Sequence, residues 1–418
     1  MSNLEELYTQ AQKYADNHKQ YEEKLIHIIK QGDNNSDEDL KAKELCFYDL
    51  ADLYCENNQA QKVLDLIKIN ENTLKEMQGA KSAKILKNLT ERVGKLKNIV
   101  QIQVDLCQYV IDWCKKEERT HLKHKQLIRL SSLYLLQDKF KQAIDIIEDL
   151  LLEVRKTDDK HLLVEAQLIE SKLHFALENF AKAKASLTSS RACSNQVYCE
   201  PALQAELDLQ SGIIFAQEKD FKTSYSYFYE AFEALHNLKD HKALDVFKYM
   251  ILCKVMTKQH DDVNGLIAGK YGTHYAGIEV EAVKEVAKTI KEKSLIQFQG
   301  VLEKYKQQLS DQVIEQIVKI LYEVLLEENL FKIIEPYSRV QINHIAKTIN
   351  LTIDQVQKKL SELILDKKIE GTLDQGNGCL ILFDDQKCDN LYPYSIDLIN
   401  QMDQVVEKLF FKSKLIKK

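Results

Sequence analysis

The sequence predicts an almost entirely α-helical protein: a right-handed, tetratricopeptide-like helical solenoid that ends in a small winged-helix module with a β-hairpin sheet, followed by one C-terminal helix. Three observations support this fold class. The 418 residues contain 12 Gly and 3 Pro, where average usage would give about 29 Gly and about 21 Pro. Apolar residues repeat with a period near forty along the N-terminal half. Near residue 370 the pattern changes to two short apolar runs around a glycine-containing turn.

A pair of helices recurs along the N-terminal half about every forty residues. Each unit has an apolar residue, an aromatic residue seven positions later, and a small residue three positions further on, where the two helices would cross. The aligned sets are Leu133, Phe140, Ala143 and Ile147; Leu173, Phe180, Ala183 and Leu187; and Ile214, Phe221, Ser224 and Phe228. One pair cannot bury its apolar face alone, so stacked pairs must supply the core of a superhelix. We assign residues 1–240 to this solenoid.

The remaining stretches before residue 331 are helical but less regular. Residues 73–116 indicate one or two long helices, because their apolar residues are spaced by three and four. After Lys242 the apolar runs shorten, and we predict helices at 247–255, 263–267, 280–290 and 295–302, and a last one at 311–329. We assign residues 241–330 to this second helical region.

Residues 331–385 have the element order of a winged helix. A short strand is expected at 331–334, before Pro336. Capping boxes at Ser338 and at Thr352 would open two helices, the second covering 353–366. The runs 369–373 and 379–383 flank a turn whose glycines supply positive φ, which predicts a hairpin. An exposed hairpin edge pairs readily with another chain, so the candidate contact residues are Leu373, Leu380, Ile381 and Leu382.

The C-terminal segment 391–418 predicts one amphipathic helix that is set off from the winged helix. Its apolar residues follow steps of four and three, as in a coiled-coil seam, and only Lys412 interrupts them. The candidate contact residues of this helix are Leu398, Met402, Val405, Leu409 and Ile416. A helix with such a stripe needs partner helices.

The charge of the chain does not favour a nucleic-acid partner. It carries 58 basic and 64 acidic residues, a net charge of −6. The second helix of the expected winged helix has two lysines against three acids and no arginine to reach base edges. A winged helix that binds protein is therefore favoured over one that binds DNA.

No catalytic, cofactor or metal motif is present. The sequence has no H-E-x-x-H and no G-x-S-x-G. Residues 265–271, GLIAGKY, are too short for a phosphate loop and carry Tyr where Ser or Thr would hold magnesium. His121 and His124 lie among lysines and are expected on a solvated face. We therefore expect no enzyme, no cofactor and no metal site.

The nine cysteines show no C-x-x-C, and Cys46, Cys107 and Cys253 fall on apolar helix faces. This favours reduced thiols in a cytoplasmic and nuclear protein. The first twenty residues are polar and amphipathic rather than a signal peptide. No run approaches eighteen apolar residues, so no membrane span is expected.

Four segments resemble the PCI family, named for the proteasome lid, COP9 signalosome and initiation factor complexes. They are 211–235 (SGIIFAQEKDFKTSYSYFYEAFEAL), 247–256 (FKYMILCKVM), 333–346 (IIEPYSRVQINHIA) and 364–385 (ILDKKIEGTLDQGNGCLILFDD). The resemblance is dense in the C-terminal half and extends to the N-terminal half only as helical pattern and length. It makes residues 241–330 the helical part of a PCI domain, 331–385 its winged-helix subdomain and 391–418 a bundle helix.

The resemblance implies a non-catalytic scaffold subunit. The stretches GNGCLILFDD and IEPYSRVQINHI are more similar to proteasome-lid members than to the second subunit of the COP9 signalosome, which is the alternative, with a nucleic-acid-binding winged helix less favoured. In the lid, such subunits join other PCI subunits through winged helices and a bundle of C-terminal helices. The N-terminal solenoid would contact the outer ring of the core particle and the ATPase ring, and so serve ubiquitin-dependent proteolysis.

Overall fold

The computed structural model describes residues 7–8, 11, 18–30, 37–57, 59–70, 79–94, 96, 99–275, 277–306, 308, 311–349, 351–374, 376–383 and 391–416. The chain divides into two compact units, Met1–Tyr275 and Ala276–Lys418. The described part is mainly helical, with one small sheet in the second unit. The predicted fold class, a helical solenoid ending in a winged helix and one further helix, is confirmed.

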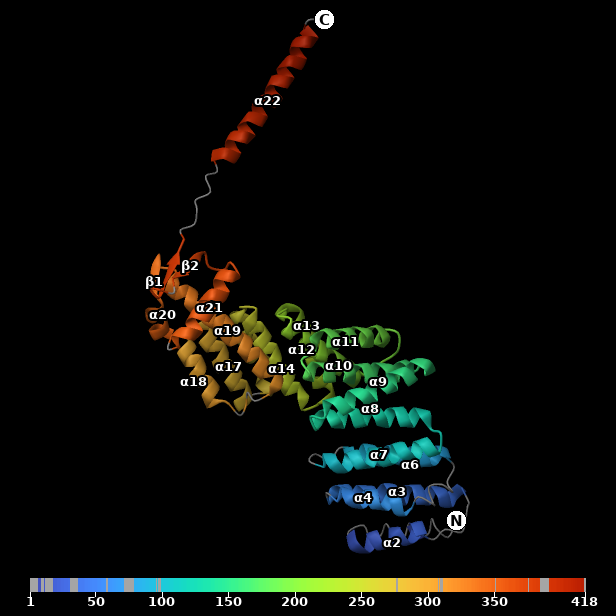
Figure 1. Cartoon of the computed structure of the whole chain (residues 1–418). Coiled ribbons are helices and arrows are strands. Elements are labelled where there is room, and N and C mark those ends of the chain that lie inside the picture. Colours follow the sequence, from blue (N-terminus) through green and yellow to red (C-terminus); the bar gives the residue numbers. More distant parts are fainter. Residues whose placement is uncertain are drawn as a thin grey trace. The chain divides into compact units, whose positions relative to one another are not determined.

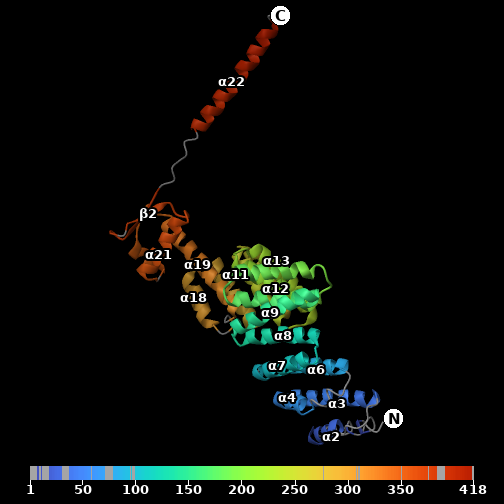
Figure 2. The ribbon, with the colours of Figure 1, turned by 45° about the vertical axis from the view of Figure 1, so that its right-hand side comes forward.

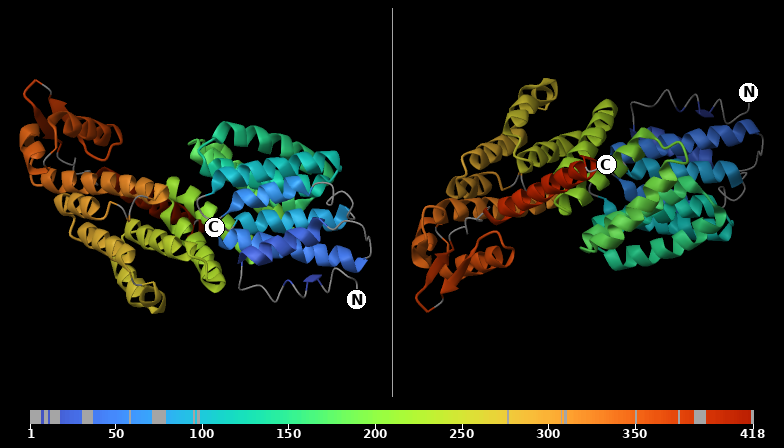
Figure 3. Two further views of the ribbon diagram at one scale, coloured as in Figure 1. Left: turned by 90° about the horizontal axis from the view of Figure 1, so that it is seen from below. Right: turned by 90° about the horizontal axis from the view of Figure 1, so that it is seen from above.

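In the first unit, helices pack against their neighbours in chain order (Figures 1 and 2). In Figure 3 the long axes of the blue and teal helices run in roughly the same direction. The helices are α2 His18–Lys30, α3 Asp37–Glu56, α4 Ala60–Ile69, α6 Gly79–Gly94, α7 Val100–Lys116, α8 Thr120–Leu136, α9 Phe140–Thr157, α10 Lys160–Ala176, α11 Phe180–Ser194, α12 Pro201–Gln217, α13 Phe221–Leu238, α14 Lys242–Met256, α15 His260–Ala268 and α16 Lys270–His274. The predicted long segment 73–116 contains two helices, and its first six residues lie outside the description. The short helix α16 was not predicted.

Most turns between the helices contain a residue other than glycine at the position with positive φ, and this explains why the chain contains so few glycines. Helices α8, α9, α10 and α11 begin at residues 120, 140, 160 and 180. The turns before these four helices, and the turns after α12, α13 and α14, each place a charged residue in the left-handed region, where Gly is usual. These residues are Glu118, Asp138, Asp158, Glu178, Lys219, Lys239 and Lys258.

Small residues lie where the paired helices cross. Ser171 Oγ of α10 donates to Ala183 O of α11 at 2.8 Å, and Ser224 Oγ of α13 donates to Gly212 O of α12 at 2.7 Å. Both bonds are buried and join residues twelve apart. Ala143 occupies the matching position in α9 and is fully buried in a cluster with Leu133 and Tyr134. The predicted register of the repeat is therefore confirmed.

Gly212 and Gly265 should respond oppositely to the same substitution. A Cβ on Gly212 would lie 2.6 Å from the Phe228 ring, whereas one on Gly265 in α15 meets nothing within 4 Å. Gly212→Ala should lower the free energy of unfolding by about 1–3 kcal/mol through overpacking. Gly265→Ala should raise it by about 0.5–1 kcal/mol through helix propensity. Urea denaturation followed by circular dichroism measures both, and shifts of the same sign would contradict the crossing geometry.

Ion pairs connect successive helix pairs along the unit. Lys62 lies 3.5 Å from Glu22 and Lys84 lies 3.0 Å from Glu44, in each case forty residues apart. The lysine of each pair is exposed, so each pair contributes little stability alone. Their regular spacing supports the register of stacked repeats.

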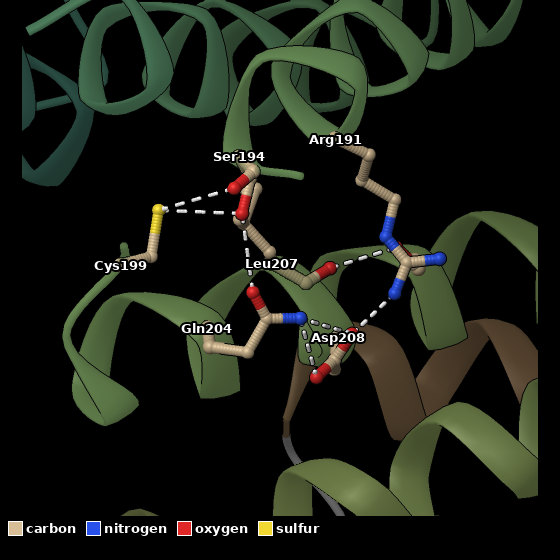
Figure 4. A network of polar contacts seen from close by, with 7 residues as sticks. Arg191, Ser194, Cys199, Gln204, Leu207 and Asp208 are labelled. Carbon is tan, nitrogen blue, oxygen red and sulfur yellow. Dashed lines mark hydrogen bonds and ion pairs between the residues drawn. The ribbon is translucent and has the colours of Figure 1, made fainter. Parts of the chain in front are cut away.

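A partly buried network of polar contacts joins α11 to α12 (Figure 4), and its arginine also contacts α13. Asp208 of α12 is 4% exposed and forms an ion pair with Arg191 of α11. Gln204 Nε2 donates to Asp208 Oδ2 at 3.2 Å, and Ser194 Oγ donates to Gln204 Oε1 at 3.2 Å. The Arg191 guanidinium also lies 4.2 Å from the centre of the Tyr227 ring in α13. Removal of one partner would leave a buried charge uncompensated.

Glu206 links three helices and gives the unit a pH-dependent contact. Its carboxylate lies 2.7 Å from Lys172 Nζ of α10 and 3.1 Å from Lys242 Nζ of α14. Burial acts to raise the pKa of Glu206, but the two ammonium groups outweigh it and lower the pKa from 4.5 to about 2. A lowered folded-state pKa adds stability at pH values above 4.5, and this stability is lost as the pH falls from 4.5 towards 2.

Glu206→Gln should therefore reduce the free energy of unfolding at pH 7. Because the side chain is 35% exposed, solvent screening limits the expected loss to about 1–2 kcal/mol. The difference from the wild-type chain should shrink as the pH is lowered below 4.5. Urea titrations at several pH values measure it, with Glu233→Gln on the exposed face of α13 as control. A difference that persists unchanged at pH 3 would contradict the lowered pKa.

The second unit contains α17 Ile278–Lys291, α18 Leu295–Lys304, α19 Gln312–Ile334, β1 Arg339–Gln341, α20 Ile342–Ile349, α21 Ile353–Leu365, β2 Gly371–Asp374, β3 Cys379–Leu382 and α22 Leu391–Ile416. The three strands form an antiparallel sheet in the order β1-β3-β2. One core cluster joins α19, both winged-helix helices and the sheet through Leu330, Ile345, Leu360, Leu363 and Leu380.

Two local predictions for the winged helix are wrong. Residues 331–334 are the end of α19 and not a strand, because Leu326, Leu330 and Ile334 continue a buried helical face into the core. The first strand is β1, where buried Val340 lies between exposed Arg339 and Gln341, so Ser338 opens no capping box. Thr352 is the N-cap of α21 as predicted, but its side chain forms no capping bond.

Candidate protein-interaction surfaces

The first candidate surface is the apolar face of α22. Every residue from 391 to 414 is exposed. Four of the predicted contact residues, Leu398, Met402, Val405 and Leu409, are 56–61% exposed. The side chain of the fifth, Ile416, lies outside the described residues.

The apolar face of α22 is wider than the predicted seam. Ile399, Val406 and Phe410 lie beside the seam and are 58–63% exposed. At 3.6 residues per turn, the seven apolar residues from 398 to 410 cover an arc of about 140°. A two-stranded seam needs a narrower stripe, so this face suits contact with more than one helix. The sequence contained this signal, in the apolar residues that directly follow Leu398, Val405 and Leu409.

The second candidate surface is the sheet of the winged helix, and here the predicted edge is wrong. β3 is the central strand, with β1 on one side and β2 on the other. Leu380 is fully buried in the core, whereas Leu373, Ile381 and Leu382 are half-buried. The sequence did not predict this strand order for two reasons. The pairing of β1 with β3 joins residues about forty apart, and β1 has only three residues, too few to show a strand pattern.

The backbone bonds show which groups face outwards from the sheet. Phe383 N donates to Glu370 O at 2.9 Å, so these two residues form a hydrogen-bonded pair. Hydrogen-bonded and non-bonded pairs alternate along antiparallel strands, so Thr372 with Ile381 is the next bonded pair. Leu373 follows Thr372 and belongs to the next, non-bonded pair, with Leu380, so it directs its N–H and C=O away from β3. The outer edge of β2 is thus an edge that another chain could extend.

Two exposed aromatic residues at one end of the sheet were not predicted as contact residues. Tyr337 and Phe383 are exposed and line an open cleft of about 890 Å³ together with Lys367, Glu370 and Leu382, among others. Their exposure depends on where α19 ends and where β3 ends. The sequence alone did not give either boundary.

The face of α21 that would enter a DNA groove holds little free positive charge. Lys359 Nζ donates to Glu362 Oε2 at 2.7 Å, and this bond raises the pKa of Lys359. Asp354 lies in the first turn of the same helix. This arrangement does not favour phosphate binding.

Within the described residues, no group of three or more His, Cys, Asp or Glu side chains could hold a metal ion. His121 is exposed as predicted, but His124 is buried and lies 3.0 Å from Glu153, so its assignment to a solvated face is wrong. Gly269 ends α15 and begins α16, which confirms helix termination rather than a phosphate loop at 265–271.

The cysteines among the described residues are free thiols, several of them in the core. Burial raises the pKa of Cys46 and of Cys253 to about 12, and that of Cys107 to about 11. Such thiols are poor nucleophiles at neutral pH. Among the described helices, none combines the length and the apolar character that crossing a membrane requires.

Two family models match the chain. The model of the 26S proteasome regulatory subunit RPN6 N-terminal domain matches residues 4–137, and that of the PCI domain matches residues 302–384. The first covers part of the N-terminal half, where the sequence patterns alone gave no family-specific motif. The second includes the whole winged helix.

Three relatives are similar to the chain over nearly its whole length. The 26S proteasome non-ATPase regulatory subunit 11 homolog of Arabidopsis thaliana is 42% identical over 93% of this chain and 93% of its own. The probable 26S proteasome regulatory subunit rpn6 of Schizosaccharomyces pombe is 40% identical over 91% of each chain. The 26S proteasome regulatory subunit RPN6 of Saccharomyces cerevisiae is 38% identical over 90% of this chain and 88% of its own.

Proposed function

The chain belongs to the family of the 26S proteasome non-ATPase regulatory subunit 11, also called RPN6, and from this premise we propose that it is a scaffold subunit of the regulatory-particle lid. The observation that carries the proposal is the similarity to these subunits along almost the entire chain, solenoid and PCI domain together. In this role the protein holds lid, ATPase ring and core particle together for ubiquitin-dependent degradation, in cytoplasm and nucleus.

The chain acts without catalysis of its own. Members of this family are generally non-catalytic scaffolds. In support, burial raises the pKa of the core thiols Cys46 and Cys253, which makes them poor nucleophiles at neutral pH. The role of the chain is then to position other subunits.

Three parts of the chain contribute contacts in this proposal. The N-terminal solenoid meets the outer ring of the core particle and the ATPase ring. The winged helix meets a neighbouring PCI subunit, and α22 enters a bundle of C-terminal helices. The exposed apolar face of α22 supports the last contact, because about 1–3 kcal/mol is gained for each large apolar side chain that becomes buried.

Co-migration on a native gel tests the proposed function. The chain should migrate with the peptidase activity of the 26S proteasome, and its depletion should convert that complex into free core particle. Unchanged 26S complexes after depletion would contradict the proposal. The signalosome alternative has less support, because the relatives are proteasome subunits.

The outer edge of β2 gives a prediction for the winged helix. Leu373→Pro removes an N–H that faces outwards, so the sheet of this chain should survive while pairing with a neighbouring subunit weakens. Leu373→Ala controls for the loss of the side chain. Co-purification of neighbouring lid subunits measures the effect, with circular dichroism to establish folding. Equal co-purification of both variants would exclude this edge as the contact.

Ile381 is also one of the predicted contact residues, but Ile381→Pro would not test the contact with a neighbouring subunit. The N–H of Ile381 faces β2, so its loss would break the ladder inside this sheet. This substitution should lower the stability of the winged helix itself.

A further inference from the structure

The seam of α22 contains polar residues at only two positions between 395 and 412. The apolar seam positions are Leu398, Met402, Val405 and Leu409, all exposed, and the polar ones are Ser395 and Lys412. We propose that in the free subunit this helix pairs in antiparallel orientation with α22 of a second copy of this chain.

One antiparallel register satisfies every seam position from 395 to 412. If Met402 lies opposite Val405 of the second copy, the spacing of four and three places Leu409 opposite Leu398. The same register places Ser395 opposite Lys412. The two polar residues therefore meet each other at the ends of the seam, where the lysine can extend to water along its flexible stem. The apolar residues meet only apolar residues in between.

The two flanks of the seam fit the same register. On one flank Ile399 lies within one turn of Val406 of the second copy, so burial continues beyond the seam. On the other flank Asp397 lies level with residue 410 of the second copy and within one turn of its Lys408. Because the pairing is two-fold symmetric, each contact occurs twice. One flank is thus apolar, and the other carries two ion pairs between copies.

Parallel pairing of two copies does not fit the helix. It would place Lys412 opposite Lys412 in the seam, with two like charges desolvated together. It would also place Asp397 level with Asp397 and Lys408 level with Lys408. The charge distribution of α22 therefore selects the antiparallel orientation.

The self-pairing would cover the face that the proposed function assigns to the helix bundle. A free subunit would then keep this face out of water until other subunits replace the second copy. This consequence rests on the proposed function, whereas the self-pairing itself does not. The two can therefore be tested separately.

Sedimentation equilibrium of the purified full-length chain tests the pairing. The average mass should rise with concentration towards twice that of one chain. Val405→Glu should abolish the rise, because it places a charge in the seam. Asn400→Glu, on the face of the helix opposite the seam, should leave it unchanged. A single-chain mass at every concentration overturns the proposal, whether α22 stays free or folds back on its own chain.

A charge exchange tests the orientation and the register. Asp397→Lys alone and Lys408→Asp alone should each weaken self-association, roughly five- to tenfold. A mixture of the two variants should associate as well as the wild-type chain, because each ion pair is then restored between unlike copies. Residues 397 and 408 are about 16 Å apart along one helix, so no contact within a copy can restore it. A mixture as weak as the separate variants overturns the antiparallel register.

Discussion

Replacing Ala143 with Lys should unfold the solenoid at a markedly lower denaturant concentration, with a loss of about 3–5 kcal/mol in the free energy of unfolding. Ala143 has no exposed surface and lies where α8 and α9 cross. A lysine there must either bury an unpaired ammonium group or force the two helices apart. Neither outcome can be relieved by a small adjustment, because the cluster around it is closely packed.

The matched control introduces the same side chain one residue earlier. Gln142 is exposed on α9, so Gln142→Lys should change the free energy of unfolding by less than about 0.5 kcal/mol. Urea denaturation monitored by far-ultraviolet circular dichroism measures both variants. Equal midpoints would refute the register of the helix pairs.

Removal of α22 should abolish assembly while leaving the free subunit almost as stable as before. All residues from 391 to 414 are exposed, so their removal in a chain that ends at Asp389 takes away no apolar surface that the rest of the chain buries. Both chains are compared at a concentration too low for the full chain to self-associate. Under this condition the truncated chain should have the same melting temperature as the full chain. In the assembled lid the same residues would be buried, at about 1–3 kcal/mol for each large side chain.

Reconstitution with the other lid subunits measures this second effect. The full chain should enter the lid, and the truncated chain should remain unincorporated. A substitution on the polar face, Glu407→Gln, should have no effect. A truncated chain that enters at the yield of the full chain would show that α22 has no role in assembly.

The helical repeat could be predicted because its signal is local and recurs. Each helix pair contributes the same sequence of apolar, aromatic and small residues, and Ala143, Ala183 and Ser224 are buried where that sequence places them. The stripe of α22 was equally visible, since it depends on spacing within one helix. The finer division of the chain at residues 240, 330 and 385 stays a prediction.

The sheet and the buried polar groups could not be predicted in the same way. β1 has three residues, too few to display a period of two, and its pairing with β3 depends on residues about forty apart. His124 is buried and lies 3.0 Å from Glu153 of the next helix. The ion pair between Arg191 and Asp208 likewise depends on how α11 packs on α12. Such contacts between helices leave no pattern within a single segment.

The most direct test of the proposed scaffold role is mass spectrometry of the proteins that co-purify with the tagged full-length chain. The account predicts recovery of the other PCI lid subunits together with proteasomal ATPases and core-particle subunits. The chain truncated after Asp389 should recover none of them. Recovery of signalosome subunits without proteasomal ATPases, from the full-length chain, would contradict the account.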